Sequence, residues 1–336
     1  MAAPLGLTMG EPAGIGGDIA LKAWMERGAA SVPPFVLLDD PDRIAALATR
    51  LGLDVPLAVV DEGGLDRVAD RLPVLPVPLP APVTYGTPDP ANGPAVIAAI
   101  DRAVALARAG HLSGVVTNPI QKSALYACGF RWPGHTEYLA HLAGLPDEGT
   151  VMLLEGGGLR VVLATIHVAV KDVAQYLTSD AILHVARVTH SALKADFGVA
   201  HPRLAVAALN PHAGENGAMG REEIEVIAPA VARLQAEGID AAGPFPADTL
   251  FHAGARARYD AVVCMYHDQG LIPLKTLDFD TGVNITLGLP FVRTSPDHGT
   301  ALSLAGTGQA NASSLIAALH AASRIAARRQ QSMSHE

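Results

Sequence analysis

The sequence predicts an α/β protein whose mostly parallel sheets are divided between two domains. Short apolar runs with the composition of buried strands alternate along the chain with longer segments that have the composition of helices. This alternation is typical of βαβ units, in which a helix joins two parallel strands. The 336 residues supply more of these segments than one sheet usually holds, so we expect two domains with a cleft between them.

The composition limits the class of protein. Hydrophobic residues make up 49% of the chain, which is enough for a large core. No apolar stretch reaches the roughly 18 residues that a membrane-spanning helix needs, and the first residues lack the pattern of a signal peptide. The formal net charge of -9 and the lack of long basic runs argue against nucleic-acid binding. Cys128 and Cys264 have no paired spacing, and we expect them to be buried thiols of a cytoplasmic protein.

In the amino-terminal half, strands and helices alternate from the first residues onward. Pro41 and Asp42 form a pair that is typical of a helix amino terminus. The proline-rich stretch 72–94 predicts an extended connection with few regular hydrogen bonds, apolar enough to pack against the protein. The expected elements are strands at 5–9, 35–38 and 112–116 and helices at 19–27, 42–51 and 91–109.

A glycine-rich turn at 10–18 separates the first strand from the first helix. Because Asp39 and Asp40 follow the next strand, the turn allows a dinucleotide-binding interpretation. The glycines, however, do not have the required three-glycine spacing, and Glu11 would lie close to a pyrophosphate. A tight structural turn that needs positive φ angles is therefore favoured.

The carboxy-terminal half continues the pattern and adds a hairpin. Thr136 has the residue type of an N-cap for a helix through Leu142. The N–H groups of a helix start also suit a phosphate, so both interpretations stay open. The further elements are a hairpin of 151–154 and 159–166, strands at 203–209, 260–266 and 283–288, and helices at 180–196, 221–236 and 312–327. The polar tail after Arg329 is expected to be frayed.

Three histidines each follow an apolar run that is expected to be a strand: His167, His212 and His267. Ligands of open α/β sheets bind at the carboxyl ends of strands, so these side chains could converge on one metal ion. Three neutral imidazoles bind Zn²⁺ well and leave an open position for a substrate. A lone histidine at such a place is more often a hydrogen-bonded structural residue, so both interpretations are kept.

Other polar residues suggest a site for an anion and a base. Lys275, Asn284 and Arg293 stand in apolar surroundings and could hold an anionic small molecule, with Arg293 as a fork and Lys275 as a point charge. Surface salt bridges are the alternative for the two cations. Asp248 could be a general base or could cap the turn that contains Thr249, and the local sequence favours the cap.

The stretch 297–311 is dense in small residues. Small residues let a ligand approach the backbone closely, so a flat ring such as adenine could lie against it. A loop that packs only on its own helix would have a similar composition, and that alternative also stays open.

Six motifs follow one another over nearly the whole chain and resemble one known family. They are Gly-Glu-Pro-Ala-Gly-Ile-Gly at 10–16, Gly-His-Thr-Glu at 134–137, Asn-Pro-His-Ala-Gly-Glu at 210–215, Pro-Ala-Asp-Thr-Leu-Phe at 246–251, Tyr-His-Asp-Gln-Gly at 266–270 and Gly-Val-Asn-Ile-Thr-Leu-Gly-Leu-Pro-Phe-Val-Arg-Thr-Ser at 282–295. The family is that of 4-hydroxythreonine-4-phosphate dehydrogenase, or PdxA. The stretch 298–311 also resembles the adenosine-binding loop of the isocitrate and isopropylmalate dehydrogenases, which share this fold class.

The resemblance implies a homodimer with two α/β domains per chain and a shared active site. It implies a divalent metal, Zn²⁺ by preference and Mg²⁺ or Co²⁺ otherwise, held by His167, His212 and His267 with ligands drawn from both subunits. It also implies a site for NAD or NADP in the small-residue stretch. The implied substrate residues are His135, Thr136, Lys275, Asn284 and Arg293; the implied cofactor residues are His298, Gly299, Thr300, Ala301 and Asn311; the catalytic candidates are Asp248 and Lys275.

For the reaction, the resemblance implies oxidation of 4-phosphooxy-L-threonine at C3 in pyridoxal 5'-phosphate biosynthesis. The β-keto acid so formed would lose CO₂ to give 3-amino-2-oxopropyl phosphate. We expect residues 1–125 with 283–330 to form the cofactor domain, residues 126–282 to form the metal and dimer domain, and residues 331–336 to be a frayed tail.

Three other functions stay open at this point. A dehydrogenase of the same fold could act on another hydroxy acid, such as a four-carbon sugar-acid phosphate or a dihydrodiol carboxylate. A metal-dependent hydrolase would also use three histidines but would leave the stretch 298–311 without a role. A non-catalytic binding protein would bind a ligand without turnover. The presence of the family's Gly-His-Thr motif in this sequence favours a phosphorylated substrate over the other compounds.

Overall fold

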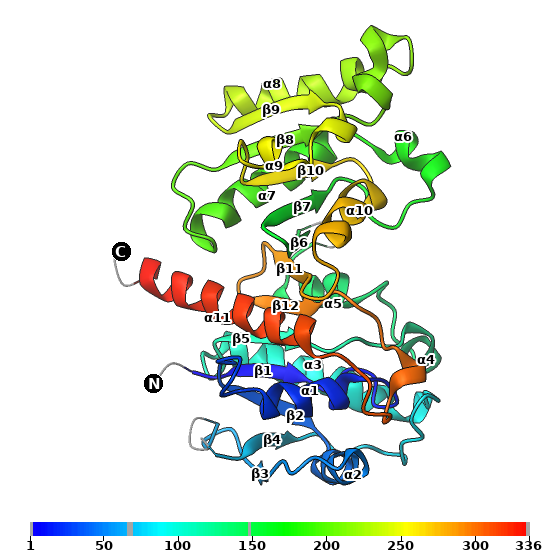
Figure 1. Ribbon diagram of the computed structural model, residues 1–336, viewed down its shortest axis with the longest axis vertical. Helices are drawn as coiled ribbons and strands as arrows, with labels where there is room; N and C mark the ends of the chain where they lie inside the picture. Colours follow the sequence, from blue (N-terminus) through cyan, green and yellow to red (C-terminus); the bar gives the residue numbers. More distant parts are fainter. Residues whose placement is uncertain (1–2, 66–69, 147–148, 334–336) are drawn as a thin grey trace. The chain divides into compact units, whose positions relative to one another are not determined.

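The computed structural model of the protein describes residues 3–65, 70–146 and 149–333 (Figure 1). The chain divides into two compact units. Unit 1 comprises residues 1–148 and 289–327, and unit 2 comprises residues 149–288 and 328–336. Among the described residues, no helix combines the length and the apolar character that crossing a membrane requires.

Unit 1 contains a fully parallel sheet with the strand order β3-β4-β2-β1-β5-β12. The bounds are β1 (Leu5–Thr8), β2 (Phe35–Asp39), β3 (Leu57–Val59), β4 (Leu72–Pro76), β5 (Gly114–Thr117) and β12 (Arg293–Pro296). The central strands β1, β2 and β5 are buried along their whole length, as expected for a parallel sheet that helices cover on both faces.

The helices of unit 1 are α1 (Gly16–Met25), α2 (Pro41–Leu51), η1 (Pro90–Asn92), α3 (Gly93–Arg108), α4 (Lys122–Ala127), α5 (His135–Ala143), η6 (Leu302–Leu304) and the first part of α11 (Ser313–Met333). The sequence explains α2 well. The Asp40 carboxylate accepts hydrogen bonds from the N–H groups of Asp42 and Arg43, Pro41 is the first helical residue, and Gly52 ends the helix with φ of 65°.

Unit 2 contains a mixed sheet with the strand order β11-β6-β7-β10-β8-β9. The bounds are β6 (Val151–Gly156), β7 (Leu159–Leu163), β8 (Arg203–Ala207), β9 (Asp240–Phe245), β10 (Ala261–Cys264) and β11 (Val283–Leu287). Strands β7, β10, β8 and β9 are parallel neighbours, while β6 forms the expected hairpin with β7 and also pairs antiparallel with β11. The α/β class with mostly parallel strands is thus confirmed.

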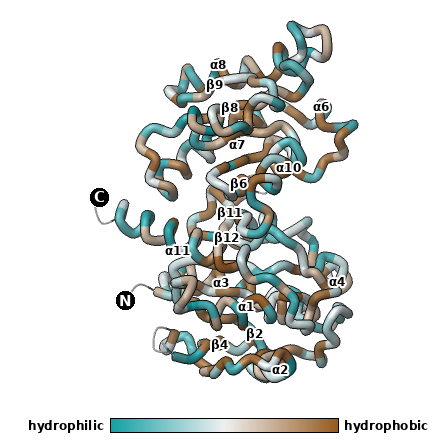
Figure 2. The backbone as a smooth tube through the Cα atoms, viewed as in Figure 1, coloured by the Kyte–Doolittle hydropathy of each residue, from teal (hydrophilic) through white to brown (hydrophobic). Residues whose placement is uncertain are grey.

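The helical segments of unit 2 are η2 (Val170–Asp172), α6 (Val173–Tyr176), α7 (Ser179–Ala195), η3 (Pro211–Gly217), η4 (Glu223–Ile227), α8 (Ala228–Ala236), η5 (Ala247–Thr249), α9 (Ala253–Arg256) and α10 (His267–Leu277). Its core joins β7, β8 and β10 with α10 through residues such as Val161, Val262 and Leu274. In the backbone tube coloured by hydropathy, hydrophobic residues mark the central strands, whereas hydrophilic and hydrophobic residues alternate along the helices (Figure 2).

Four strands were missed by the sequence analysis. β4 lies inside the stretch that was expected to be an irregular connection, and no strand was expected at the positions of β3, β9 and β12. Pro73 and Pro76 in β4 and Pro244 in β9 explain the error, since proline lacks the N–H of a sheet ladder and argues against a strand.

The unit boundaries also differ from the expected ones. Helix α5 belongs to unit 1, because Tyr138 and Leu139 are part of the core formed with α3 and β5. Strand β11 belongs to unit 2, where it pairs with β6. The expected frayed tail is helical through Met333, while residues 334–336 lie outside the described part of the chain. Arg329 of α11 pairs with the buried Asp196 at 2.6 Å, which explains why the helix continues.

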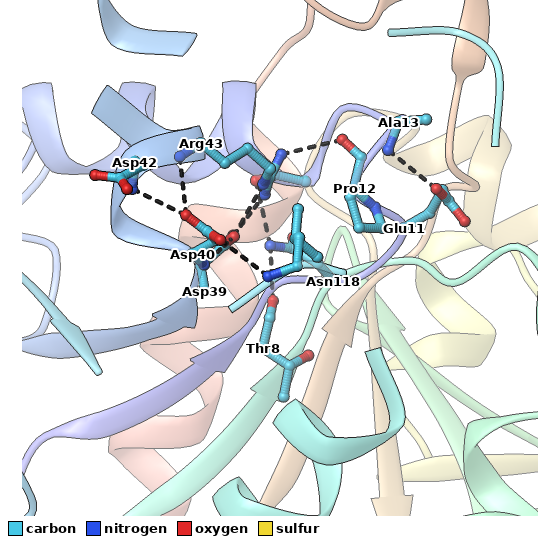
Figure 3. A network of polar contacts seen from close by, with 11 residues as sticks. Thr8, Glu11, Pro12, Ala13, Asp39, Asp40, Asp42, Arg43 and Asn118 are labelled. Carbon is cyan, nitrogen blue, oxygen red and sulfur yellow. Dashed lines mark hydrogen bonds and ion pairs between the residues drawn. The ribbon is translucent and has the colours of Figure 1, made fainter. Parts of the chain in front are cut away.

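A buried polar network holds the glycine-rich turn of unit 1 (Figure 3). The Arg43 guanidinium donates from Nε to Asp39 Oδ1 at 2.9 Å and from Nη1 to the carbonyl oxygen of Pro12 at 3.0 Å. The Asn118 amide donates to the carbonyl oxygen of Thr8 at 3.1 Å. Gly10 has φ of 68°, so the structural interpretation of this turn is supported.

Candidate active site

The three histidines follow neighbouring parallel strands of unit 2. His167 comes after β7, His267 after β10 and His212 after β8, and β10 pairs with both of the other strands. The sequence therefore placed all three correctly at one edge of the sheet. His167 and His212 are exposed, and His267 is the first residue of α10.

Two of these rings are close together. The ring centroids of His167 and His267 are 6.0 Å apart, roughly the separation of two imidazoles that bind one ion through bonds of about 2.0–2.1 Å. The Nδ1 atom of His267 lies 2.7 Å from the Asp268 carboxylate, a contact that orients the ring. In the described part of this chain, however, no three His, Cys, Asp or Glu side chains form a metal-binding group. Convergence of all three histidines within one chain is therefore not found.

His212 lies on an unusual loop. Residues His212 to Asn216 are five consecutive residues with positive φ, from 45° to 76°, and only Gly214 among them lacks a Cβ atom. Left-handed backbone costs about 1–2 kcal/mol for each ordinary residue. The buried Glu223 carboxylate holds the start of this loop by accepting hydrogen bonds from the N–H groups of Leu209 at 2.9 Å and Asn210 at 2.7 Å.

Unit 1 contains a buried cation at the start of β12. Arg293 is 4% exposed and donates from Nε and Nη2 to the Thr117 hydroxyl at 3.2 and 2.7 Å. Burial lowers the pKa of Arg293 to about 10, and the nearby Glu137 carboxylate opposes this shift. The guanidinium is still charged near neutral pH, so a bound anion would stabilise it.

His135 lies near this guanidinium. Burial lowers the pKa of His135 well below its ordinary value of 6.5, and the charges of Arg293 and Lys122 lower it further. Its Nε2 atom is buried and has no hydrogen-bond partner among the described residues. The imidazole is thus neutral, with one polar atom left for a ligand.

His135 also begins helix α5. Gly134 is the N-cap, so Thr136 is inside the first turn and the expectation that Thr136 caps this helix is wrong. Within the described part of the chain, no side chain caps the helix start. The first N–H groups and the positive end of the helix dipole therefore favour an anion, which keeps the phosphate interpretation of His135 and Thr136.

Replacing His135 with Gln is expected to weaken the loss of stability in acid. The unfolded chain protonates His135 below its ordinary pKa of 6.5, whereas the folded protein does not until a much lower pH. The free energy of unfolding therefore falls as pH decreases below about 6.5 and stops falling, for this group, once the folded pKa is passed. Urea unfolding at about pH 7 and about pH 5 measures the effect. Equal losses in both proteins would mean that His135 is not buried in its neutral form.

The other proposed substrate and catalytic residues belong to unit 2. Asn284 lies in β11, and its Oδ1 atom is buried without a hydrogen-bond partner among the described residues. Lys275 is in the last turn of α10, with Nζ 5.7 Å from the centroid of the Phe279 ring. Asp248 is exposed, and its side chain caps neither η5 nor any other helix start among the described residues, so the favoured capping interpretation is wrong.

The small-residue stretch is an ordered loop of unit 1. His298 has a buried Nε2 atom without a described hydrogen-bond partner, and a Cβ atom on Gly299 would meet no atom within 4 Å. Ala301 has φ of 41°, and Asn311 is exposed. Space beside Gly299 and the Nε2 atom of His298, which is unpaired among the described residues, fit a bound heteroaromatic ring.

A family model described as pyridoxal phosphate biosynthetic protein PdxA matches residues 31–322, which is most of the 336-residue chain. The chain belongs to the PdxA family. A relative from Methylorubrum extorquens (strain PA1), named 4-hydroxythreonine-4-phosphate dehydrogenase, is 55% identical over 331 residues, which cover 97% of this chain and 95% of the relative.

Two solved structures are similar to this PdxA family member. The crystal structure of 4-hydroxythreonine-4-phosphate dehydrogenase from Klebsiella pneumoniae has 38% sequence identity and a TM-score of 0.88, with 97% of this chain and 100% of the other covered. The crystal structure of a terephthalate 1,2-cis-dihydrodiol dehydrogenase from Burkholderia xenovorans LB400 has 31% identity and a TM-score of 0.65, with 96% and 98% covered.

The sequence analysis missed the residues that hold the small-residue loop of this PdxA family member. The buried Asp18 carboxylate accepts a hydrogen bond from the N–H of Gly306 at 3.0 Å. Lys22 donates to the carbonyl oxygens of Gly308 and Ala310, and Arg50 donates to that of Gly306. These contacts join residues more than 250 positions apart, and local sequence gives no signal for them.

Proposed function

We propose that the protein is an NAD(P)-dependent, metal-requiring dehydrogenase that oxidises 4-phosphooxy-L-threonine at C3 in pyridoxal 5'-phosphate biosynthesis. The names of the relatives at 55% and 38% identity support this activity. The structural observation that carries it is the pairing of a buried Arg293 with an unsatisfied, buried His135 Nε2 atom at the start of α5. That combination suits an anionic group such as a phosphate.

The substrate is proposed to be bound by His135, Thr136, Lys275, Asn284 and Arg293. The buried Asn284 amide oxygen suits an amino or hydroxyl donor, while the cations and the helix start suit the phosphate and carboxylate ends. An analogue without the matching polar groups would leave these protein atoms unpaired, which is a strong basis for specificity.

The metal is proposed to be bound by His167 and His267 of one chain together with His212 of a second chain. The 6.0 Å separation of the His167 and His267 rings supports these two as ligands of one ion. Because His212 is exposed, it could bind the metal ion held by a second copy of the chain. When bound, a divalent metal, with Zn²⁺ preferred over Mg²⁺ or Co²⁺, would supply Lewis-acid polarisation of a substrate oxygen.

A homodimer follows from this arrangement. Unit 2 exposes several large apolar side chains near the histidines in sequence: Val170 at 75%, Tyr176 at 60%, Ile272 at 64% and Phe279 at 77%. Apolar side chains exposed to this degree are typical of surfaces that another protein covers. A second copy of this chain is the proposed occupant, because it would also bring His212. We propose a cytoplasmic location, which the two free cysteines support.

The cofactor is proposed to bind the loop residues His298, Gly299, Thr300, Ala301 and Asn311. When bound, NAD or NADP would supply the acceptor for a hydride. The backbone of this loop is fixed by Asp18, Lys22 and Arg50, so little ordering is needed on binding.

Asp248 is proposed to accept the proton of the C3 hydroxyl. Its carboxylate is exposed and accepts no hydrogen bond from the described residues, so it is available as a base. The positive charge of Lys275 is proposed to stabilise negative charge that develops on the substrate. Oxidation removes a hydride and a proton from the alcohol, and the β-keto acid then loses CO₂ to give 3-amino-2-oxopropyl phosphate.

A substrate panel tests this proposal. Formation of reduced nicotinamide would be followed with 4-phosphooxy-L-threonine, its dephosphorylated analogue, a four-carbon sugar-acid phosphate and a dihydrodiol carboxylate, each with NAD and with NADP. The expected result is the highest kcat/KM for 4-phosphooxy-L-threonine. The dihydrodiol is included because the Burkholderia xenovorans LB400 structure, with 31% identity, is named for that activity. A higher kcat/KM for another compound would replace the proposed substrate.

A further inference from the structure

Lys122 is an exposed residue at the start of α4 in unit 1, and it makes no hydrogen bond or ion pair with any residue that the structure describes. Its side chain lies against the start of α5. A Cβ atom on Gly134 would be 3.7 Å from Cε and 3.9 Å from Nζ of Lys122. The ammonium group is thus placed beside the N-cap of the helix that carries His135 and Thr136.

The neighbours of this ammonium group also favour an anion. The ring of His135 is close enough to Lys122 and Arg293 for both charges to lower its pKa, and its buried Nε2 atom has no described partner. Arg293 is almost fully buried. Side-chain capping is absent at the first turn of α5, so its N–H groups add positive potential.

The charge balance gives Lys122 a specific role. Glu137 lies near both Gly134 and Arg293, so its carboxylate offsets the charge of the Arg293 guanidinium. A phosphate monoester carries a charge of about -1.5 to -2 near neutral pH. Without Lys122, such a group would meet a neutral imidazole and side-chain charges that cancel. With Lys122, the side chains have a net positive charge.

We propose that Lys122 binds the phosphate group of the substrate, together with His135, Thr136 and Arg293. The proposal rests on the proposed function for the nature of the substrate. Lys122 donates a charge-assisted hydrogen bond to a phosphate oxygen, and this contact distinguishes phosphorylated from unphosphorylated hydroxy acids.

The phosphates of the cofactor are a second possible source of the same chemistry. The hydroxyl of Thr300, in the small-residue loop, donates to the side-chain oxygen of Gln121 at 3.2 Å, and Gln121 precedes Lys122. The substrate phosphate is favoured because the ammonium group of Lys122 is close to Gly134 and His135, at the start of α5, where the substrate phosphate is proposed to bind. The experiment must therefore measure KM for both compounds.

The test compares Lys122→Met and Lys122→Arg with the wild-type dimer loaded with metal. Lys122→Met should raise KM for the phosphorylated substrate about tenfold and change kcat less than about twofold, since a partly exposed charged contact is lost. Lys122→Arg should recover most of the affinity. KM for the unphosphorylated analogue and KM for NAD should stay unchanged. Lys194→Met, which removes an exposed lysine on α7, is the matched control and should behave as wild type.

Equal increases in KM for the phosphorylated and unphosphorylated compounds would overturn the proposal, as would an increase confined to KM for NAD. Calorimetric titration with inorganic phosphate provides a readout that does not depend on turnover. Lys122→Met should weaken phosphate binding about tenfold, whereas unchanged binding would contradict the role of Lys122. If the wild-type enzyme oxidised no phosphorylated hydroxy acid, the proposed function would fail, and the phosphate titration would still decide the role of Lys122.

Discussion

His212→Ala and His267→Ala are each expected to abolish metal binding and to lower kcat/KM at least about 1000-fold, because several kcal/mol of Lewis-acid stabilisation are lost. A hybrid dimer with one chain of each variant should regain about half of the wild-type activity. In that hybrid, His167 and His267 of one chain are intact, and under the proposed arrangement they share a site with the intact His212 of the other. One of the two sites is thus complete.

The hybrid would be produced by co-expression with two different affinity tags, and its metal content and turnover would be measured. His201→Ala is the matched control, since His201 is an exposed histidine of unit 2 outside the proposed site. A hybrid as inactive as its parents would mean that His212 and His267 of one site come from the same chain. A single variant with full activity and full metal content would show that the histidine is not a ligand.

The backbone at His212 supports the idea that its position is functionally constrained. Five consecutive residues with positive φ are unfavourable by several kcal/mol in total, so surrounding contacts must hold them. Glu223 fixes the residues directly before them, because its carboxylate accepts hydrogen bonds from the N–H groups of Leu209 and Asn210 and from the Asn210 side-chain amide. Gly214 is required there, since a Cβ atom would lie 2.6 Å from the Glu223 carboxylate. A backbone conformation of this cost next to a buried carboxylate is consistent with the proposed role of His212 as a metal ligand.

The sequence predicted that each of the three histidines follows a strand, because the alternation of apolar strand segments with helical segments can be recognised locally. His167, His212 and His267 each follow an apolar run, and the parallel pairing of these strands brings their ends to one edge. What the sequence did not predict was the distance between the histidine rings along that edge. Local sequence cannot show that the ring centroids of His167 and His267 lie 6.0 Å apart while no three described side chains form a metal-binding group.

Errors arose where a residue type has two common uses. Thr136 is a frequent N-cap, yet Gly134 takes that position, and Thr136 lies in the first turn of α5. Asp248 looked like a cap and does not act as one. Because proline is unfavourable inside a sheet, β4 was not predicted, yet the strand that contains Pro73 pairs with β2 on one side and with β3 on the other. In each case the tertiary environment overrides the local preference, which sequence reasoning alone cannot measure.

Arg43→Met is expected to lower the free energy of unfolding of unit 1 by about 3–5 kcal/mol, because the Asp39 carboxylate would be left buried without its partner. Both side chains are nearly inaccessible, at 4% and 0% exposure. Both tryptophans, Trp24 and Trp132, belong to unit 1, so their fluorescence during urea unfolding reports on this unit even if unit 2 unfolds separately.

Two further variants separate loss of the ion pair from loss of packing. Glu62→Gln removes an exposed ion pair of the same unit, with 35% and 53% exposure of its side chains, and should cost less than about 1 kcal/mol. Adding Asp39→Asn to Arg43→Met removes the unpaired charge and should restore part of the stability. If the double variant were no more stable than Arg43→Met, the loss would come from packing and from the bond to Pro12. That bond holds the turn whose Ile15 N–H donates to the Thr300 carbonyl oxygen. Because Thr300 belongs to the proposed cofactor site, Arg43→Met should also raise KM for NAD.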